Sequence, residues 1–233
     1  MNIALEFGTM KLDSSKEEVV FEQYKDILVK EGIIVVDVAP RSDQELLEFA
    51  LLFGHVVPGA RGEMVQNLPA RQKGEGPIGS FSYSVGYESF PWHTDTAYWD
   101  RPARYLLLYS PVASPCATTY QSFEAIRTAI PDFDYLMERA VFLLDVPGKR
   151  HYLSPSIDGK GYRLDFHIYR PVNDEAFHLR KCVSEYLIKN HFRHVWSGKE
   201  VVIMDNWRFI HAREDAQNDK SRLLKRIYIN ELV

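Results

Sequence analysis

The chain has 233 residues, of which 45% are hydrophobic and 26% are charged. Its 28 basic and 32 acidic residues nearly cancel, so no nucleic-acid or anionic-membrane partner is expected. The sequence shows no run of about 20 apolar residues and no basic-then-apolar leader, which argues against a membrane span and a secretion signal. Cys116 and Cys182 are expected to be free thiols, and the cytoplasm is the expected compartment.

The first predicted elements are two helices around a buried strand. Apolar residues at helical spacing from Val20 to Leu28 predict a helix that ends at Gly32. Residues 32–36 (GIIVV) then predict a strand, and Ser42 caps a second helix that stops at Gly54. We expect these helices to brace the outside of a sheet.

Residues 54–92 form a long segment in which glycine and proline are frequent, with a short strand predicted at Met64 to Leu68. Because apolar strands flank it on both sides, we interpret the segment as an active-site loop region and not as a domain linker. The chain, residues 1–233, is therefore expected to be a single domain.

The rest of the chain is predicted to be mainly strands. Strands are predicted at residues 105–109, 140–146, 162–169, 200–204 and 223–229. Helices are predicted at 122–130 and at 174–191, the second with Phe177, Val183, Tyr186 and Leu187 facing inward. This pattern indicates an α+β, mainly β fold: a double-stranded β-helix (a cupin-like jelly roll) with N-terminal and inserted helices.

Two segments offer a set of metal ligands. Residues 91–95 (PWHTD) contribute His93 and Asp95, which are two positions apart and would share one face of a strand. Far downstream, residues 205–211 (DNWRFIH) contribute His211. Two histidines and one carboxylate can hold a non-haem Fe(II) on one face and leave the opposite positions open for substrate chemistry.

A pair of arginines follows the second histidine. Arg222 and Arg226 are four positions apart and would share a strand face, and arginine grips a carboxylate with two parallel hydrogen bonds. Each motif alone is commonly structural in unrelated proteins. Their order gives them weight, because the His-x-Asp triplet follows an aromatic-rich loop and the arginines lie on the strand after the second histidine.

Together these motifs resemble the Fe(II)- and 2-oxoglutarate-dependent dioxygenases, specifically the taurine dioxygenase and clavaminate synthase-like branch. The resemblance is carried by residues 93–95 (HTD), 198–206 (GKEVVIMDN), 211–213 (HAR), Arg222 and Arg226. Residues 116–122 (CATTYQS) are similar to the stretch in which a threonine of the family touches the cosubstrate, although the family usually has glycines at positions 116 and 117.

The resemblance implies three iron ligands, His93, Asp95 and His211. Arg226 falls where the family pairs an arginine with the distal carboxylate of 2-oxoglutarate, and Thr119 falls where a hydroxyl supports that carboxylate. Arg222 falls where a second arginine approaches the carboxylate beside the keto group. Thr118 stays open as an alternative to Thr119, because a slip of one residue exchanges strand faces.

The implied reaction couples oxidative decarboxylation of 2-oxoglutarate, with O2, to C–H oxidation of a small polar metabolite such as an amino acid or a natural-product intermediate. Hydroxylation is the expected outcome, and the presence of Asp95 disfavours halogenation. No catalytic residue is expected beyond the metal centre. The candidate substrate contacts are Tyr83, Trp92 and Arg213, although the two aromatic residues would equally suit a strand-rich core.

Two other functions fit the same residues. A cupin-type metalloenzyme could bind zinc or manganese with this triad and not use 2-oxoglutarate, and a non-catalytic member of the fold could bind metal without turnover. Asp205 is expected to end a strand or support the site. The remaining histidines are expected to be structural or exposed: His55, His151, His167, His178, His191 and His194. The sequence leaves the oligomeric state open.

Overall fold

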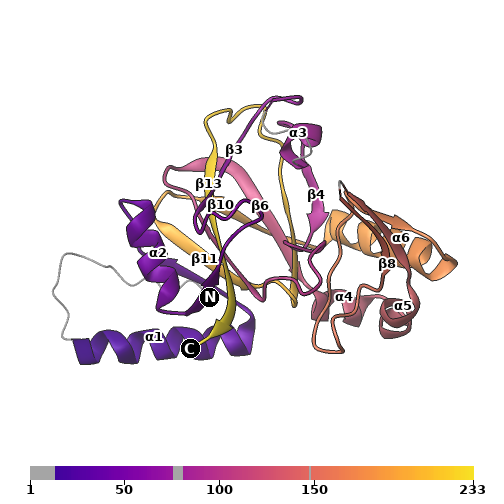
Figure 1. Cartoon of the computed structure of the whole chain (residues 1–233), viewed down its shortest axis with the longest axis horizontal. Helices are drawn as coiled ribbons and strands as arrows, with labels where there is room; N and C mark the ends of the chain where they lie inside the picture. Colours follow the sequence, from indigo (N-terminus) through magenta and orange to yellow (C-terminus); the bar gives the residue numbers. More distant parts are fainter. Residues whose placement is uncertain (1–13, 76–80, 147) are drawn as a thin grey trace.

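The fold is built on two antiparallel sheets (Figure 1). A computed structural model describes residues 14–75, 81–146 and 148–233; for residues 14–19 and 81–82 only the backbone is considered. In the larger sheet the strand order is β1-β11-β5-β13-β2, and β3 also pairs with β13. Its strands are β1 (Ile33–Asp37), β2 (Gly54–Val57), β3 (Gln66–Pro69), β5 (Tyr105–Tyr109), β11 (Glu200–Asp205) and β13 (Leu223–Leu232).

The smaller sheet has the order β10-β6-β12-β4. Its strands are β10 (Phe192–Trp196), β6 (Ser114–Ser122), β12 (Phe209–Arg213) and β4 (Phe90–His93). The two sheets enclose a core to which β5, β11 and β13 contribute from one side and β10 and β12 from the other. This arrangement confirms the predicted jelly roll.

The N-terminal helices cover the outer face of the larger sheet, as predicted (Figure 1). These are α1 (Ser14–Glu31) and α2 (Asp43–Leu51). Ser42 caps α2, because its Oγ accepts a hydrogen bond of 3.1 Å from the Glu45 N–H. Gly32 adopts a φ of +79°, which turns the chain out of α1 and into β1.

Both faces of the larger sheet are therefore buried. Along β5, Tyr105, Leu107 and Tyr109 contact the helical layer, while Leu106 and Leu108 belong to the core between the sheets. A strand that is buried on both sides needs an apolar residue at every position, which explains why this segment lacks polar alternation.

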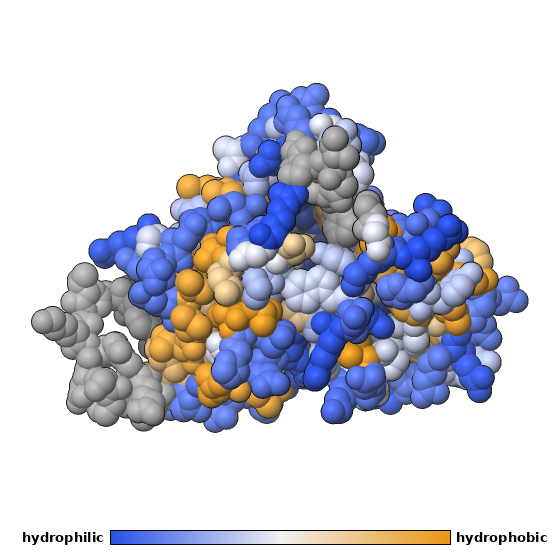
Figure 2. Space-filling model, viewed as in Figure 1, coloured by the Kyte–Doolittle hydropathy of each residue, from blue (hydrophilic) through white to orange (hydrophobic). Residues whose placement is uncertain are grey.

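A separate lobe packs on the outer face of the smaller sheet, at the right of Figure 1. It contains a three-stranded sheet, β8 (Lys149–Leu153), β7 (Phe142–Val146) and β9 (Tyr169–Pro171), with helices α4 (Phe123–Ala129), α5 (Phe133–Arg139) and α6 (Asp174–Lys189). Ile210 of β12 belongs to the same apolar core and joins the lobe to the barrel. On the face shown in Figure 2, hydrophilic residues dominate the lobe, whereas hydrophobic residues gather over the N-terminal helical layer.

The strand predicted at residues 162–169 is wrong. Residues 166–168 form a turn, Tyr169 begins β9, and the segment pairs with β4 through an isolated bridge between His93 and Asp165. The carboxylate of Asp165 accepts hydrogen bonds from the N–H groups of His167 (2.8 Å) and Ile168 (3.1 Å). An aspartate that binds the following backbone in this way favours a turn over an extended strand.

The inward face predicted for α6 is partly wrong. Phe177 is 59% exposed, whereas Val183 and Leu187 are buried as predicted and Tyr186 is partly buried. The remaining buried residues of the helix are Ala176 and Leu179. The helical period was therefore correct, but its phase was misplaced at the first turn.

The described part of residues 54–92 contains regular structure and is not only a loop. It contains β2, β3, helix α3 (Phe81–Val85) and β4. Cys116 is buried, Cys182 is partly buried, and both are free thiols as expected. Within the described ranges, none of the helices is both long and apolar enough to span a membrane.

Candidate metal centre

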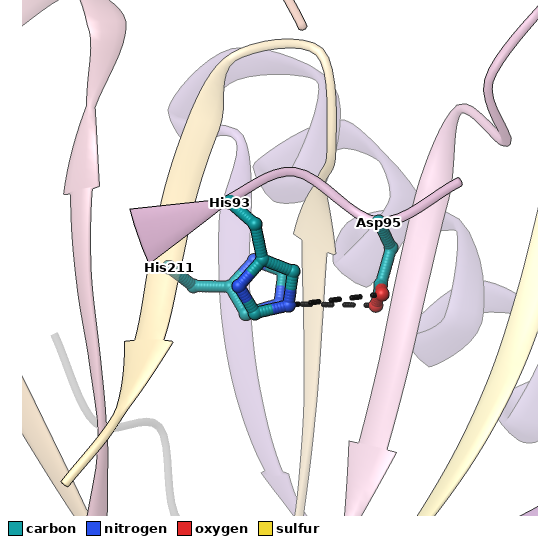
Figure 3. A group of neighbouring side chains, drawn as sticks. All are labelled: His93, Asp95 and His211. Atoms are coloured by element: carbon teal, nitrogen blue, oxygen red, sulfur yellow. Dashed lines mark ion pairs between the residues drawn. The ribbon is translucent and has the colours of Figure 1, made fainter. Parts of the chain in front are cut away.

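The three predicted ligands meet at the end of the smaller sheet (Figure 3). His93 is the last residue of β4, and His211 lies directly opposite it on β12. The centroids of the two imidazole rings are 4.3 Å apart. Asp95 lies two residues beyond the end of β4, and both histidine rings point toward its carboxylate.

The spacing of the three side chains fits one metal ion. Asp95 Oδ1 is 3.9 Å from His93 Nε2, and Asp95 Oδ2 is 3.7 Å from His211 Nε2. These separations are too long for hydrogen bonds but suit a shared ion with bonds of about 2.1 Å to each ligand. Over residues 14–75, 81–146 and 148–233, no second group of three histidine, cysteine or acidic side chains converges in this way.

Two of the ligands, His211 and Asp95, are in the protonation states that bind metal. Burial, with a smaller effect of the neighbouring His93, lowers the pKa of His211 to about 3, so its imidazole is neutral at pH 7. Burial alone would raise the pKa of the Asp95 carboxyl, but Arg226 and the two histidines together hold it below its ordinary value. A neutral imidazole and an ionised carboxylate are the forms that coordinate a metal ion.

The backbone orients one of the histidines. His93 Nδ1 lies 2.8 Å from the carbonyl oxygen of Pro91, so the Nδ1–H donates there and the lone pair of Nε2 faces Asp95. His211 Nδ1 is buried and has no hydrogen-bond partner among the described residues. Packing, together with the ladder of β12, therefore sets the position of His211.

Arg226 lies beside the metal ligands. Its Nη1 donates a hydrogen bond of 2.8 Å to Asp95 Oδ1, and its Nη2 donates one of 2.7 Å to Gln66 Oε1. Gln66 reaches it from β3, which pairs with β13 so that the two residues are directly opposite. Gln66 lies within the short strand predicted at Met64 to Leu68. Nothing in the local sequence connects Gln66 with Arg226, so the sequence did not identify Gln66 as a residue of the site.

Arg222 occupies a different place, immediately before β13. It is 4% exposed, and its Nε donates a hydrogen bond of 3.3 Å to the carbonyl oxygen of Cys116. Within the described part of the chain it forms no ion pair with a carboxylate, and burial lowers its pKa to about 10. A buried guanidinium without a counter-ion fits the carboxylate of a small ligand.

The register of β6 contradicts the expectation for Thr119. In the β6–β12 pair, Thr118 is opposite Arg213, while Thr119 is opposite Ala212. Directly opposed residues on neighbouring strands point to the same face of the sheet. Arg213 is two positions after His211 on β12, so these two side chains also share one face, and Ala212 points to the other. Thr118 therefore shares the face of His211, and Thr119 points to the other face of the sheet.

The three substrate candidates have different environments. Trp92 packs against the apolar core of the lobe, because it alternates with His93 along β4 and leaves the opposite face. Arg213 donates hydrogen bonds to the carbonyl oxygens of Gly86 (2.7 Å) and Glu88, so it holds the segment that leads into β4. Tyr83 lies on α3, beside this segment. The contacts described for Trp92 and Arg213 are made to the protein itself, and a substrate contact of any of the three residues stays a prediction.

The remaining predictions for ionisable residues are consistent with the structure. Asp205 ends β11 and forms an ion pair of 2.6 Å with Arg104, so it is not part of the ligand group. His194 approaches Glu200 to 3.2 Å, and His191 Nδ1 lies 2.7 Å from the carbonyl oxygen of Leu187. None of these side chains joins the ligand group.

A jelly roll that carries two histidines and an aspartate at the end of one sheet defines a mononuclear non-haem metal centre. A family model described as "Taurine catabolism dioxygenase TauD, TfdA family" matches residues 3–119 and 113–228. The chain belongs to this family of dioxygenases, whose cofactors are Fe(II) and 2-oxoglutarate. No curated protein sequence matches the chain.

Several solved structures share the fold. An asparagine oxygenase in complex with Fe(II), 3-hydroxyasparagine and succinate is 16% identical, with a TM-score of 0.71 over 93% of this chain and 79% of that one. The non-haem iron oxygenase OrfP, bound to (3S)-hydroxy-L-Arg, is 18% identical, with a TM-score of 0.70 over 91% and 80%. PvcB of Pseudomonas aeruginosa is 19% identical, with a TM-score of 0.65 over 90% and 79%.

Proposed function

We propose that this Fe(II)- and 2-oxoglutarate-dependent oxygenase hydroxylates a free amino acid or a closely related amino carboxylate. The observation that carries the proposal is the convergence of the metal triad with Arg226 and a set of unpartnered polar atoms at one end of the barrel. When bound, iron and 2-oxoglutarate supply the oxidising chemistry. The residues of this chain bind and orient the cosubstrate and the substrate, and they exclude water from the site.

We assign the distal carboxylate of 2-oxoglutarate to Arg222 and Thr118. Arg222 contacts the carbonyl oxygen of Cys116, which is two residues before Thr118 on β6. Arg226 is four residues further along β13, about 13 Å away at about 3.3 Å per residue, and touches a metal ligand. A group that binds Arg226 must therefore lie beside the metal, which supports the reverse of the two arginine roles expected from the sequence.

The atoms around Arg226 favour a zwitterionic substrate. Three buried atoms have no hydrogen-bond partner in the described ranges: Glu63 Oε2, Gln66 Nε2 and Arg226 Nε. The first is an acceptor that suits an ammonium group, and the other two are donors that suit a carboxylate. Burial would lower the pKa of the Arg226 guanidinium, but Asp95 raises it most and Glu63 adds a smaller effect, so Glu63 lies close to Arg226. The amino-acid products bound to the asparagine oxygenase and OrfP agree with this class.

The function is tested by an anaerobic titration of metal-free protein with Fe(II) and then with 2-oxoglutarate. The expected result is the weak visible absorption band of an iron-chelated keto acid in the wild type and its absence in His93→Ala. A screen of free L-amino acids by succinate release then identifies the substrate, with N-acetylated forms as controls. Bound Fe(II) without the band would favour the cupin-type alternative, and a band without any turnover would favour a non-catalytic member.

The role of Glu63 predicts a selective loss of substrate affinity. In Glu63→Gln, KM for the amino-acid substrate should rise by about 10- to 100-fold, because a buried ammonium loses a charged hydrogen bond of about 1.5–3 kcal/mol. The affinity for 2-oxoglutarate should not change. Steady-state kinetics with each substrate varied in turn measures both quantities. Glu75→Gln, which alters an exposed glutamate of the same segment, is the control. An unchanged KM in Glu63→Gln would refute the assignment.

A further inference from the structure

The carboxylate ligand is held by a side chain and not by a strand. The ladder of β4 stops at His93, so the backbone of Asp95 has no strand partner. Instead, the Asp95 N–H donates a hydrogen bond of 2.8 Å to Asn206 Oδ1, and Asn206 Nδ2 donates one of 2.9 Å to the Asp95 carbonyl oxygen. One amide side chain thus takes the place of a neighbouring strand at this residue.

The Asn206 amide is itself fixed in place. Asn206 is 1% exposed, and its Nδ2 also donates a hydrogen bond to the carbonyl oxygen of Ala103 (2.9 Å). Its backbone N–H donates a hydrogen bond to the carbonyl oxygen of Arg104 (2.8 Å). On the other side of Asp95, Thr96 adopts a φ of +54°, and its Oγ1 donates a hydrogen bond of 2.7 Å to the Asp95 carbonyl oxygen. The backbone around the ligand is therefore determined by side-chain hydrogen bonds.

Asn206 also connects two of the ligands through the chain. It lies in the short connection between β11 and β12, and His211 follows on β12. The connection that carries the amide holding Asp95 therefore leads directly into the strand that carries another ligand, His211. Since Asp95 Oδ2 and His211 Nε2 are 3.7 Å apart, a shift of the Asp95 backbone would change the geometry available to the metal.

We propose that Asn206 is a positioning residue of the metal centre, whose side-chain amide sets the place of Asp95 relative to the two histidines and so determines metal affinity. The inference rests on the triad as the metal site. It goes beyond the ligands themselves, because Asn206 touches the backbone of Asp95 and not the coordinating atoms. Loss of a residue that orients a metal ligand costs about 10- to 100-fold in metal affinity.

The test is the dissociation constant for Co(II), a spectroscopically visible substitute for Fe(II), measured by titration of metal-free protein. Asn206→Ala is expected to raise this constant by about 10- to 100-fold. Asn206→Ser serves the same purpose if the alanine variant does not fold. Asn173→Ala is the matched control, because the Asn173 amide likewise bridges two backbone groups, here within the lobe. Its Oδ1 accepts a hydrogen bond from the Val141 N–H (2.9 Å), and its Nδ2 donates one to the carbonyl oxygen of Arg139 (2.8 Å). This control should lose stability and keep its Co(II) affinity.

A double-mutant cycle separates positioning from general stabilisation. If Asn206 acts through Asp95, adding Asn206→Ala to Asp95→Ala should weaken Co(II) binding by less than about twofold, because the group it positions is gone. The proposal is overturned if the folded Asn206 variants bind Co(II) like the wild type, or if the same loss appears in the Asp95→Ala background. If His211→Ala also retained wild-type affinity, the metal site itself would be misassigned.

Discussion

Replacing His211 with alanine is expected to abolish metal binding and reduce turnover to background. The residue supplies one of three protein ligands, and it is buried at the centre of β12, where no other side chain of the described ligand group can replace it. Metal binding should stabilise the wild type by about 2.7 kcal/mol at a concentration 100 times Kd. Metal should not stabilise the His211→Ala variant. Thermal unfolding of both proteins with and without Fe(II) or Co(II) measures this difference directly.

His191→Ala is a suitable control for this experiment. His191 is partly buried and stacks edge-on against Trp92 with 5.6 Å between ring centroids, but it is not part of the ligand group. Its removal should lower stability without changing the stabilisation by metal. If His211→Ala were stabilised by metal as strongly as the wild type, the triad would not be the metal site.

Arg222→Ala should weaken 2-oxoglutarate binding by about 3 kcal/mol, or roughly 150-fold in Kd, while Fe(II) binding is retained. The physical reason is that the guanidinium is buried without a carboxylate partner in the described residues, so the ligand would supply its counter-ion. Arg222→Lys should recover only part of the loss, because an ammonium cannot form two parallel hydrogen bonds. Titration of the iron-chelated keto-acid band measures this affinity.

Two further variants show whether the effect is specific. Arg180→Ala removes a partly buried arginine that binds the backbone carbonyls of Phe166 and Tyr169 in the lobe, and it should leave 2-oxoglutarate affinity unchanged. Arg226→Ala should mainly weaken binding of the amino-acid substrate. If Arg226→Ala instead caused the larger loss of 2-oxoglutarate affinity, the arginine roles originally expected from the sequence would be correct.

Local signals in the sequence predicted the elements that depend on neighbours in the chain. Ser42 and Ser122 each cap a helix through a hydrogen bond to the backbone three residues later, and such contacts form within one turn. The bounds of β5 were predicted from an uninterrupted run of apolar residues, which is also a signal carried by neighbouring positions in the chain. In contrast, β2, β8 and β10 were missed, because short strands are defined by partners that lie far away in the sequence.

The metal triad was determined by the sequence, since the residue types, their order and their resemblance to a known family suffice to select His93, Asp95 and His211. Only the tertiary structure shows that Thr118, and not Thr119, shares the face of His211, because a period of two shows that neighbours point to opposite faces without showing which face is inside. The same holds for Arg226 beside Asp95, and for Asn206 holding its backbone. These contacts join residues that are more than 100 positions apart, so their energies depend on the packing of whole sheets and leave no local pattern in the chain.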